Sequence, residues 1–275
     1  MGVVRTDRWL RMYAEQWEKA ESLTEKVNVA RKTLIRPLCD VFQTKDAQAL
    51  QDHLLQAGLL HPDQPPAPQW LEREEPWRIV AEQYRRLRQK WTGPEVKIYL
   101  LPIEERNRFL SEQLGGKMGL TLPEAVILFI HPAIEEEELR ALLTHEYHHC
   151  CRLFQTKVTE QEITLLESIV MEGLAEHAVK EELGTERMAV WTRYYDRTWN
   201  RDWFEQWLRP NLDLPDRRLH YRYLYGDRQR GIPLWLGYYC GFRLVATAWD
   251  EKASTDRLLT CSAKELLTKS EFHDR

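Results

Sequence analysis

The stretch Ala141–Cys150, which reads ALLTHEYHHC, constrains this chain more than any other. His145 and His149 are four residues apart, and residues at that spacing lie on the same face of an α-helix. Two imidazoles on one helical face can bind one metal ion, which is the geometry of the H-E-x-x-H motif. Glu146 lies beside them, where its carboxylate can accept a proton from a metal-activated water. The stretch therefore predicts a helix that carries two metal ligands and a general base.

The residues on both sides of the motif are typical of a helix. Pro132 suits the first helical turn, and four acids at Glu135–Glu138 suit the positive end of the helix dipole. Apolar residues recur at helical spacing, away from the two histidines, at Leu139, Leu143, Tyr147, Cys150 and Phe154. We expect the helix to start near Pro132 and its histidines to face away from most of the apolar packing. The alternative is that the histidines only cover a polar helix surface.

A catalytic zinc site has three protein ligands and one open position, so a third ligand is needed. A second helical run, residues 161–183, offers Glu172, which is separated from His149 by 22 residues. The adjacent Gly173 would let this helix pack closely on the first one. We predict Glu172 as the third ligand. Glu176, one turn later, is the alternative third ligand or the hydrogen-bond partner of a ligand histidine.

Other polar residues of the two helices receive supporting roles. We place His148 beside the metal site, where it would support a ligand, with core packing as the alternative for both His148 and His177. Glu167 falls on another face of the second helix, so we expect it to be solvated.

Two segments resemble a known family. His145–His149 (HEYHH), followed by Ile169–Glu176 (IVMEGLAE), looks like the YjaZ-type domain of unknown function, a bacterial family described as predicted zinc-dependent proteases. Residues 5–9 (RTDRW) and 237–241 (GYYCG) are also similar to that family, more weakly. Among metallopeptidases the pattern is similar to the gluzincins. The resemblance implies a peptidase that holds one zinc ion per chain through His145, His149 and Glu172, with Glu146 as the base.

The chain departs from the best-known gluzincins in two respects. The gap between His149 and the glutamate is longer, and the aminopeptidase motif that grips a substrate amine is missing. We therefore expect an endopeptidase acting on peptide or protein substrates. Its tetrahedral oxyanion would need a donor opposite the zinc. Tyr238 is the first candidate, followed by His220 and Tyr225, and the alternative for each is packing.

The expected fold is α+β and mostly helical, a gluzincin-like metallopeptidase with a small β-sheet over the active-site helix. An N-terminal helical region, residues 1–92, would pack on a catalytic domain, residues 93–275, or the two form one continuous domain. Partner binding is the alternative role of the N-terminal region. Its helices are expected at residues 7–32, 46–57 and 76–91.

Strand composition occurs at residues 95–101 and in the glycine-led segment 115–130. By resemblance, residues 115–121 would pair with the substrate backbone, and the alternative is that they cap the core.

The aromatic-rich residues 186–208 are more typical of a packed core than of a surface that binds a ligand. We expect a loop at residues 210–233 and a core helix at 234–249 that is broken by Gly237 and Gly241. A short helix is expected at residues 263–270.

Composition bounds the remaining functions. The net charge of −4 gives no basic footprint, so we expect no nucleic-acid binding. The apolar runs are too short to span a bilayer, and residues 1–10 lack the apolar core of a secretory signal. Five cysteines, an odd number, argue against a disulfide framework. A cytoplasmic protein without membrane contact is expected, and its oligomeric state and substrate are not predicted.

Two other functions compete with the enzyme. One is a catalytically inactive metallopeptidase-like protein that acts as a binding or regulatory module, against which the intact Glu146 argues. The other is a helical scaffold without metal in which the motif is accidental.

Overall fold

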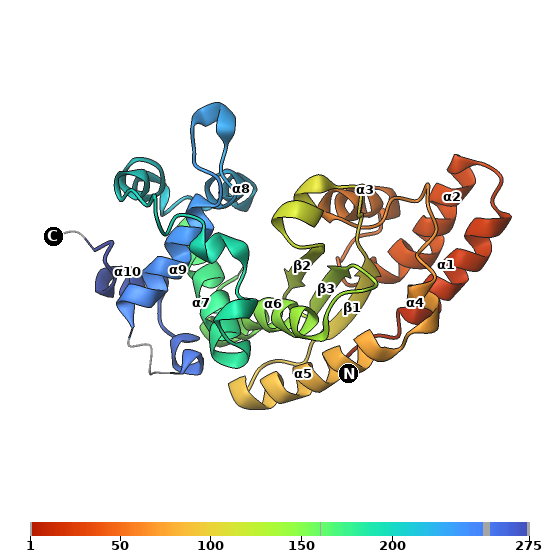
Figure 1. The fold of residues 1–275 in the computed structure, drawn as a ribbon, viewed down its shortest axis with the longest axis horizontal. Coiled ribbons are helices and arrows are strands. Elements are labelled where there is room, and N and C mark those ends of the chain that lie inside the picture. The colour runs from red at the N-terminus through yellow and green to blue at the C-terminus, as the bar shows by residue number, and fades with distance from the viewer. Residues whose placement is uncertain (1, 160, 250–253, 274–275) are drawn as a thin grey trace. The chain divides into compact units, whose positions relative to one another are not determined.

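The structure is a computed structural model that describes residues 2–159, 161–249 and 254–273. The described chain is mostly helical and contains one three-stranded sheet, so the α+β class is confirmed (Figure 1). The helices are α1 (Asp7–Lys19), α2 (Leu23–Ala30), α3 (Ala47–Ala57), α4 (Gln69–Glu72), α5 (Glu75–Trp91), α6 (Glu136–Thr156), α7 (Leu165–Leu183), α8 (Arg217–Leu224), α9 (Leu236–Ala248) and α10 (Ala263–Lys269). The strands are β1 (Lys97–Pro102), β2 (Lys117–Leu122) and β3 (Ala125–Ile130).

The chain forms two compact units. The first comprises residues 1–89 and 94–147, and the second comprises residues 90–93 and 148–275. The helix α6 continues without interruption from Glu136 to Thr156, so it contributes residues to both units. The predicted division near residue 92 stays a prediction.

The sheet of the first unit has the order β1-β3-β2. The central strand β3 pairs in parallel with β1 and antiparallel with β2. All six residues of β3, AVILFI, are buried, as expected of a strand covered on both faces. Segment 115–130 was predicted as one β segment, but it contains two strands, β2 and β3, joined by a turn at Pro123–Glu124. Strand β2 lies at the edge of the sheet, and its residues are half-buried.

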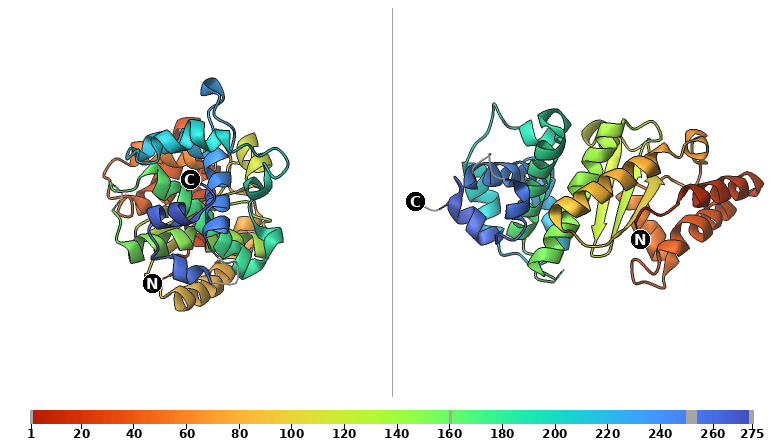
Figure 2. Two further views of the ribbon diagram at one scale, coloured as in Figure 1. Left: turned by 90° about the vertical axis from the view of Figure 1, so that its left-hand side faces the viewer. Right: turned by 90° about the horizontal axis from the view of Figure 1, so that it is seen from below.

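The N-terminal residues and α5 hold this sheet in place. The backbone around Val3 pairs with Ile98 on the outer side of β1, and the Thr6 hydroxyl donates a 2.6 Å hydrogen bond to the Leu100 carbonyl. Figure 2 shows α5 lying across one face of the strands. The helix predicted for residues 7–32 is instead two helices, because Ser22 begins a new one through a capping box with Glu25.

The helix α6 begins later than predicted. Pro132 lies in a turn in which the backbone N–H of Ala133 donates to His131 Nδ1 at 3.0 Å, and the helix starts at Glu136. The predicted apolar stripe is buried as far as Cys150, but Phe154 in the last turn is 58% exposed. The stripe therefore contributes to the core over most of the helix and leaves its end to solvent.

In the second unit, α7 and α9 pack with their main chains in direct contact (Figure 1). A Cβ atom on Gly173 would overlap the carbonyl oxygen of Gly241, and a Cβ atom on Gly241 would overlap the carbonyl oxygen of Ile169. The prediction that Gly173 lets α7 pack on the metal helix is therefore wrong, because Gly173 faces α9. The predicted break in α9 is also wrong, because the helix runs unbroken through Gly237 and Gly241.

We expect Gly241→Ala to destabilise the protein by about 3 kcal/mol or more, because the added methyl group meets a main chain that cannot move aside. Helix propensity alone would predict the opposite sign, because alanine stabilises a helix interior by about 1 kcal/mol relative to glycine. The measurement is the thermal midpoint of unfolding. The control Ala246→Gly, on the same helix, should lower stability only by about the 1 kcal/mol difference in helix propensity. A stabilised Gly241→Ala variant would contradict this packing.

The region predicted as loop at residues 210–233 contains a helix. Asp216 accepts a hydrogen bond from the Arg218 backbone N–H and starts α8, a cap that the sequence analysis missed. The aromatic residues before it are largely packed, as predicted. Trp191, Tyr195 and Phe204 are at most 7% exposed.

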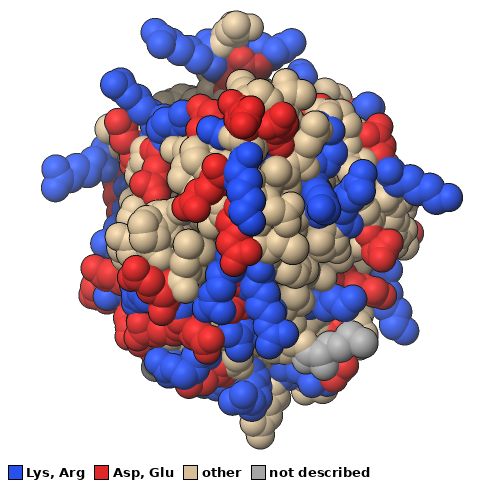
Figure 3. Space-filling model, turned by 90° about the vertical axis from the view of Figure 1, so that its right-hand side faces the viewer, with Lys and Arg blue, Asp and Glu red and all other residues tan. Residues whose placement is uncertain are grey.

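Charged side chains are mixed over the surface near α1 and α2. Figure 3 shows basic and acidic residues interspersed on that side of the molecule. No helix in the described part of the chain combines the length and the apolarity that crossing a bilayer requires.

Candidate metal centre

The two motif histidines and one glutamate of α7 come together. His145, His149 and Glu172 each offer one ligand atom, and these three atoms lie within 4.8 Å of one another. His145 and His149 are one turn apart on α6, and His149 Nε2 is 3.6 Å from Glu172 Oε2. His149 is only 6% exposed, while the other two are half-buried. Glu176, the alternative third ligand, is not in this group.

This donor set fits a zinc ion. Zinc binds histidine nitrogens and carboxylate oxygens at about 2.0–2.2 Å in a tetrahedral arrangement, so two of its ligand atoms are about 3.4 Å apart. The 3.6 Å between His149 and Glu172 matches that spacing with little movement. Two imidazoles and one carboxylate form a ligand set typical of catalytic zinc, which leaves a fourth position open.

A buried ion pair fixes the two ligand-bearing helices to each other. Arg152, three residues after His149 on α6, donates to Glu167 of α7 from Nε at 2.6 Å and from Nη2 at 3.2 Å. Its Nη1 donates to three backbone carbonyls, those of Leu258, Leu259 and Cys261. Arg152 is fully buried and Glu167 is 8% exposed. The prediction that Glu167 is solvated is wrong, because Arg152 neutralises its charge within the core.

The carboxylate of Glu146 lies against the edge strand β2. Thr121 Oγ1 is 2.7 Å from Glu146 Oε2 and 3.0 Å from the Glu146 carbonyl oxygen. Gly119 lies two residues before Thr121, and a Cβ atom there would overlap the carboxyl group of Glu146. Both residues lie in the segment 115–121 that was predicted to pair with the substrate, but neither was predicted to contact Glu146. The available signal was a glycine and a threonine two residues apart in a segment with strand composition, which places both on one face of the strand.

Two residues predicted to support the ligands have other contacts. Glu176 is buried and accepts a 2.8 Å hydrogen bond from the Ala189 backbone N–H. His148 is fully buried, and its ring lies edge-on to Trp91 with the centroids 5.3 Å apart. Their predicted contacts with a ligand histidine stay predictions. His177, the other histidine of α7, stacks on Phe242 at 4.4 Å.

The three candidate oxyanion donors are all in the second unit, and their surroundings differ. His220 Nε2 is 2.8 Å from the Leu214 carbonyl, and its Nδ1 is 2.9 Å from the Ser168 hydroxyl. Burial lowers the pKa of His220, which favours a neutral ring with Nε2 donating and Nδ1 accepting. Both ring nitrogens are thus engaged.

The two tyrosine candidates are in contact with each other. The rings of Tyr225 and Tyr238 meet edge-on with centroids 4.9 Å apart. Tyr238 also contacts Trp191 and Trp235, and it is 8% exposed. Aromatic packing therefore fixes the ring of Tyr238.

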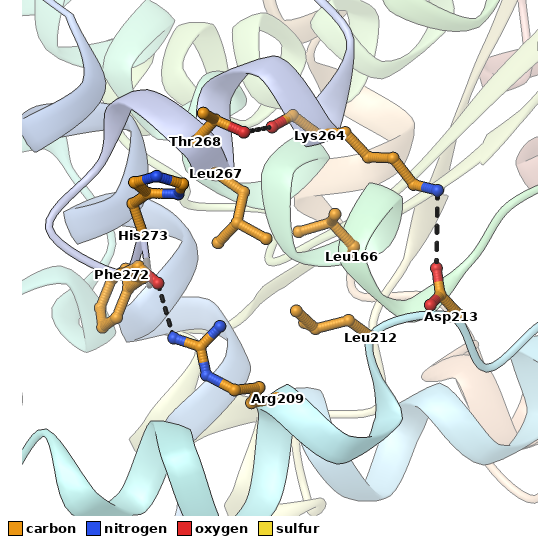
Figure 4. A pocket seen from close by; sticks show the side chains of 9 residues that line it. All are labelled: Leu166, Arg209, Leu212, Asp213, Lys264, Leu267, Thr268, Phe272 and His273. Carbon is orange, nitrogen blue, oxygen red and sulfur yellow. Dashed lines mark hydrogen bonds and ion pairs between the residues drawn. The ribbon is translucent and has the colours of Figure 1, made fainter. Parts of the chain in front are cut away.

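A pocket of about 350 Å³ lies elsewhere in the second unit (Figure 4). None of the predicted site residues lines it. Its floor is apolar, and the cations at its rim already have partners, since Arg209 donates to the Phe272 carbonyl at 2.6 Å and Lys264 is 3.9 Å from Asp213. The pocket is therefore separate from the metal centre.

Comparison with known proteins places the chain in a family. Residues 76–268 match the family model described as "Predicted Zn-dependent protease (DUF2268)". The chain is 39% identical over 188 residues to "Uncharacterized protein YjaZ" of Bacillus subtilis (strain 168), a match that covers 68% of this chain and 70% of that protein. It is 24% identical over 166 residues to "Uncharacterized protein YjfC" of the same organism, covering 57% of this chain and 54% of that protein.

No solved structure matches the chain significantly. The family match covers well over half of the chain and includes both helices of the metal centre. The chain therefore belongs to the YjaZ-type family of predicted zinc-dependent proteases.

Proposed function

We propose that this protein is a zinc-dependent endopeptidase that hydrolyses internal bonds of peptide or protein substrates. The observation that carries the proposal is the group formed by His145, His149 and Glu172, with Glu146 next to the first ligand. The family description supports the same reaction class. An H-E-x-x-H helix with a glutamate on the following helix, close to a small sheet, is also the plan that the gluzincin resemblance implies.

In this proposal, each residue has a defined part in the reaction. His145, His149 and Glu172 would hold the ion, and zinc, when bound, supplies a Lewis acid that polarises the peptide carbonyl and lowers the pKa of water. Glu146 accepts the proton of the attacking water and later gives it to the leaving amine. The edge strand β2 is where a substrate backbone would add as a further strand.

The oxyanion that forms on the substrate needs a hydrogen-bond donor. His220 has both ring nitrogens engaged, so we assign this role to a tyrosine. Tyr238 is our first choice because it lies in the segment 237–241 that resembles the family, and because contacts with Trp191, Tyr225 and Trp235 fix its ring. Tyr225 remains the alternative.

The same geometry disfavours a purely structural or binding module. A structural zinc site is closed by a fourth protein ligand, whereas the group found among the residues that the structure describes has three members. Glu146 also has its carboxylate held by the Thr121 hydroxyl. A protein that only bound a partner would not need a carboxylate held in this way.

Removing the metal should abolish the activity. We expect the zinc-loaded protein to cleave internal bonds in a peptide library, to lose cleavage after treatment with a chelator, and to regain it when zinc is restored. Magnesium should not restore it, because magnesium prefers oxygen ligands in an octahedral arrangement. Cleavage is read by mass spectrometry of the products. Cleavage that survives complete metal removal, or zinc-loaded protein that cleaves no peptide, would contradict the proposal.

A further inference from the structure

We infer that the edge strand β2 positions the Glu146 carboxylate, with Thr121 as its hydrogen-bond donor and Gly119 as the gap that the carboxylate fills. This inference rests on the proposed role of Glu146 as the base. It adds two positioning residues that lie outside the metal-binding helices.

The Thr121 hydroxyl is placed to hold one carboxylate oxygen. Its Oγ1 is 2.7 Å from Glu146 Oε2 and 3.0 Å from the Glu146 carbonyl oxygen. A hydroxyl has one hydrogen to donate, and a bond to an ionised carboxylate is stronger than one to a neutral carbonyl. Thr121 therefore fixes Oε2, the oxygen at the shorter distance.

Gly119 makes room for the same carboxylate. Residues 119 and 121 point to the same face of β2, because side chains alternate along a strand. A Cβ atom at residue 119 would overlap Glu146 Cγ, Cδ and Oε1. On that face of β2, Gly119 leaves the space that the Glu146 carboxylate occupies, and Thr121 supplies its hydrogen-bond donor.

The arrangement distinguishes the two carboxylate oxygens. Oε2 is bonded to Thr121, whereas Oε1 has no hydrogen bond within residues 2–159, 161–249 and 254–273. In the proposed reaction, Oε1 is the oxygen that would take the proton from water. Because a misplacement of about 1 Å can cost a reaction about 10²-fold, loss of this support should lower turnover measurably.

The test compares Thr121→Val with Thr121→Ser in the zinc-loaded chain. Valine keeps the shape and removes the donor, so we expect kcat to fall about 10- to 100-fold with KM and zinc content unchanged. Serine keeps the hydroxyl and should restore most of kcat. Thr268→Val, the same change on the exposed face of α10 where the hydroxyl bonds the Lys264 carbonyl, should leave kcat unchanged. A general loss of folding would lower the thermal midpoint as well, so this is measured for each variant.

A second variant addresses the gap on the strand. Gly119→Ala should displace the carboxylate and lower kcat at least as far as Thr121→Val, with zinc still bound. If the wild-type protein cleaves peptides and Thr121→Val stays within twofold of its kcat, the inference is overturned while the proposed function stands.

The inference can also be judged if the proposed function fails. If the zinc-loaded wild-type protein cleaves no peptide, crystal structures of the wild-type protein and Thr121→Val decide. A Glu146 carboxylate that lies in the same place in both structures overturns the inference, and one that moves away from β2 only in the variant supports it.

Discussion

Replacing Glu146 by glutamine is expected to lower kcat of the zinc-loaded protein by about 10²- to 10⁴-fold, the usual contribution of a general base. The amide has the size of the carboxylate and can still accept the Thr121 hydrogen bond, but it cannot take a proton from water. Because Glu146 is not one of the three grouped ligands, zinc should remain at one ion per chain. The measurements are kcat on a peptide that the wild-type protein cleaves and zinc per chain by atomic spectroscopy.

A matched control separates this effect from a general change in charge. Glu137→Gln changes an exposed acid in the first turn of the same helix and should leave kcat unchanged. Wild-type turnover in Glu146→Gln would show that another group is the base.

Replacing Arg152 by alanine is expected to destabilise the protein by about 3–5 kcal/mol, because it leaves Glu167 as a buried charge without its partner. Three backbone carbonyls lose their donor as well. Since about 1 kcal/mol shifts the midpoint by about 2–4 °C in a protein of this size, thermal unfolding should move down by about 6–20 °C. The zinc affinity should also fall, because the pair joins α6 next to His149 to α7 near Glu172.

The control for this prediction is an ion pair on the surface. Arg218 pairs with Asp216 at 2.9 Å, but its side chain is 89% exposed. Arg218→Ala should leave the midpoint essentially unchanged, since exposed pairs contribute little. If Arg152→Ala unfolds at the same temperature as the wild-type protein, the buried pair does not hold the two helices together.

The metal helices could be predicted from the sequence because their signals are local. A spacing of four residues places His145 and His149 on one helical face wherever that helix lies. The helical pattern of residues 161–183 likewise identified α7, which begins four residues later than predicted, and through it Glu172. The roles of these residues remain proposals, as do those of Tyr238 and Tyr225.

The errors concern contacts between segments that are distant in the sequence. A glutamate in a helix is usually exposed to solvent, and only the tertiary packing gives Glu167 a buried partner in Arg152. Gly241 was predicted to break a helix and Gly173 to face the metal helix, but each is required where α7 and α9 cross. Gly119 and Thr121 gain meaning only when β2 is placed against Glu146. None of these contacts leaves a periodic signal in the chain.

The most direct test of the metal centre is zinc bound per chain in the wild-type protein, Glu172→Ala and His149→Ala, measured after dialysis against metal-free buffer. The centre predicts one zinc ion in the wild-type protein. It also predicts a loss of affinity in both variants that exceeds the roughly 10- to 100-fold cost of losing a supporting hydrogen bond. Wild-type protein without zinc, or a Glu172→Ala variant that binds zinc as tightly as the wild type, would contradict it.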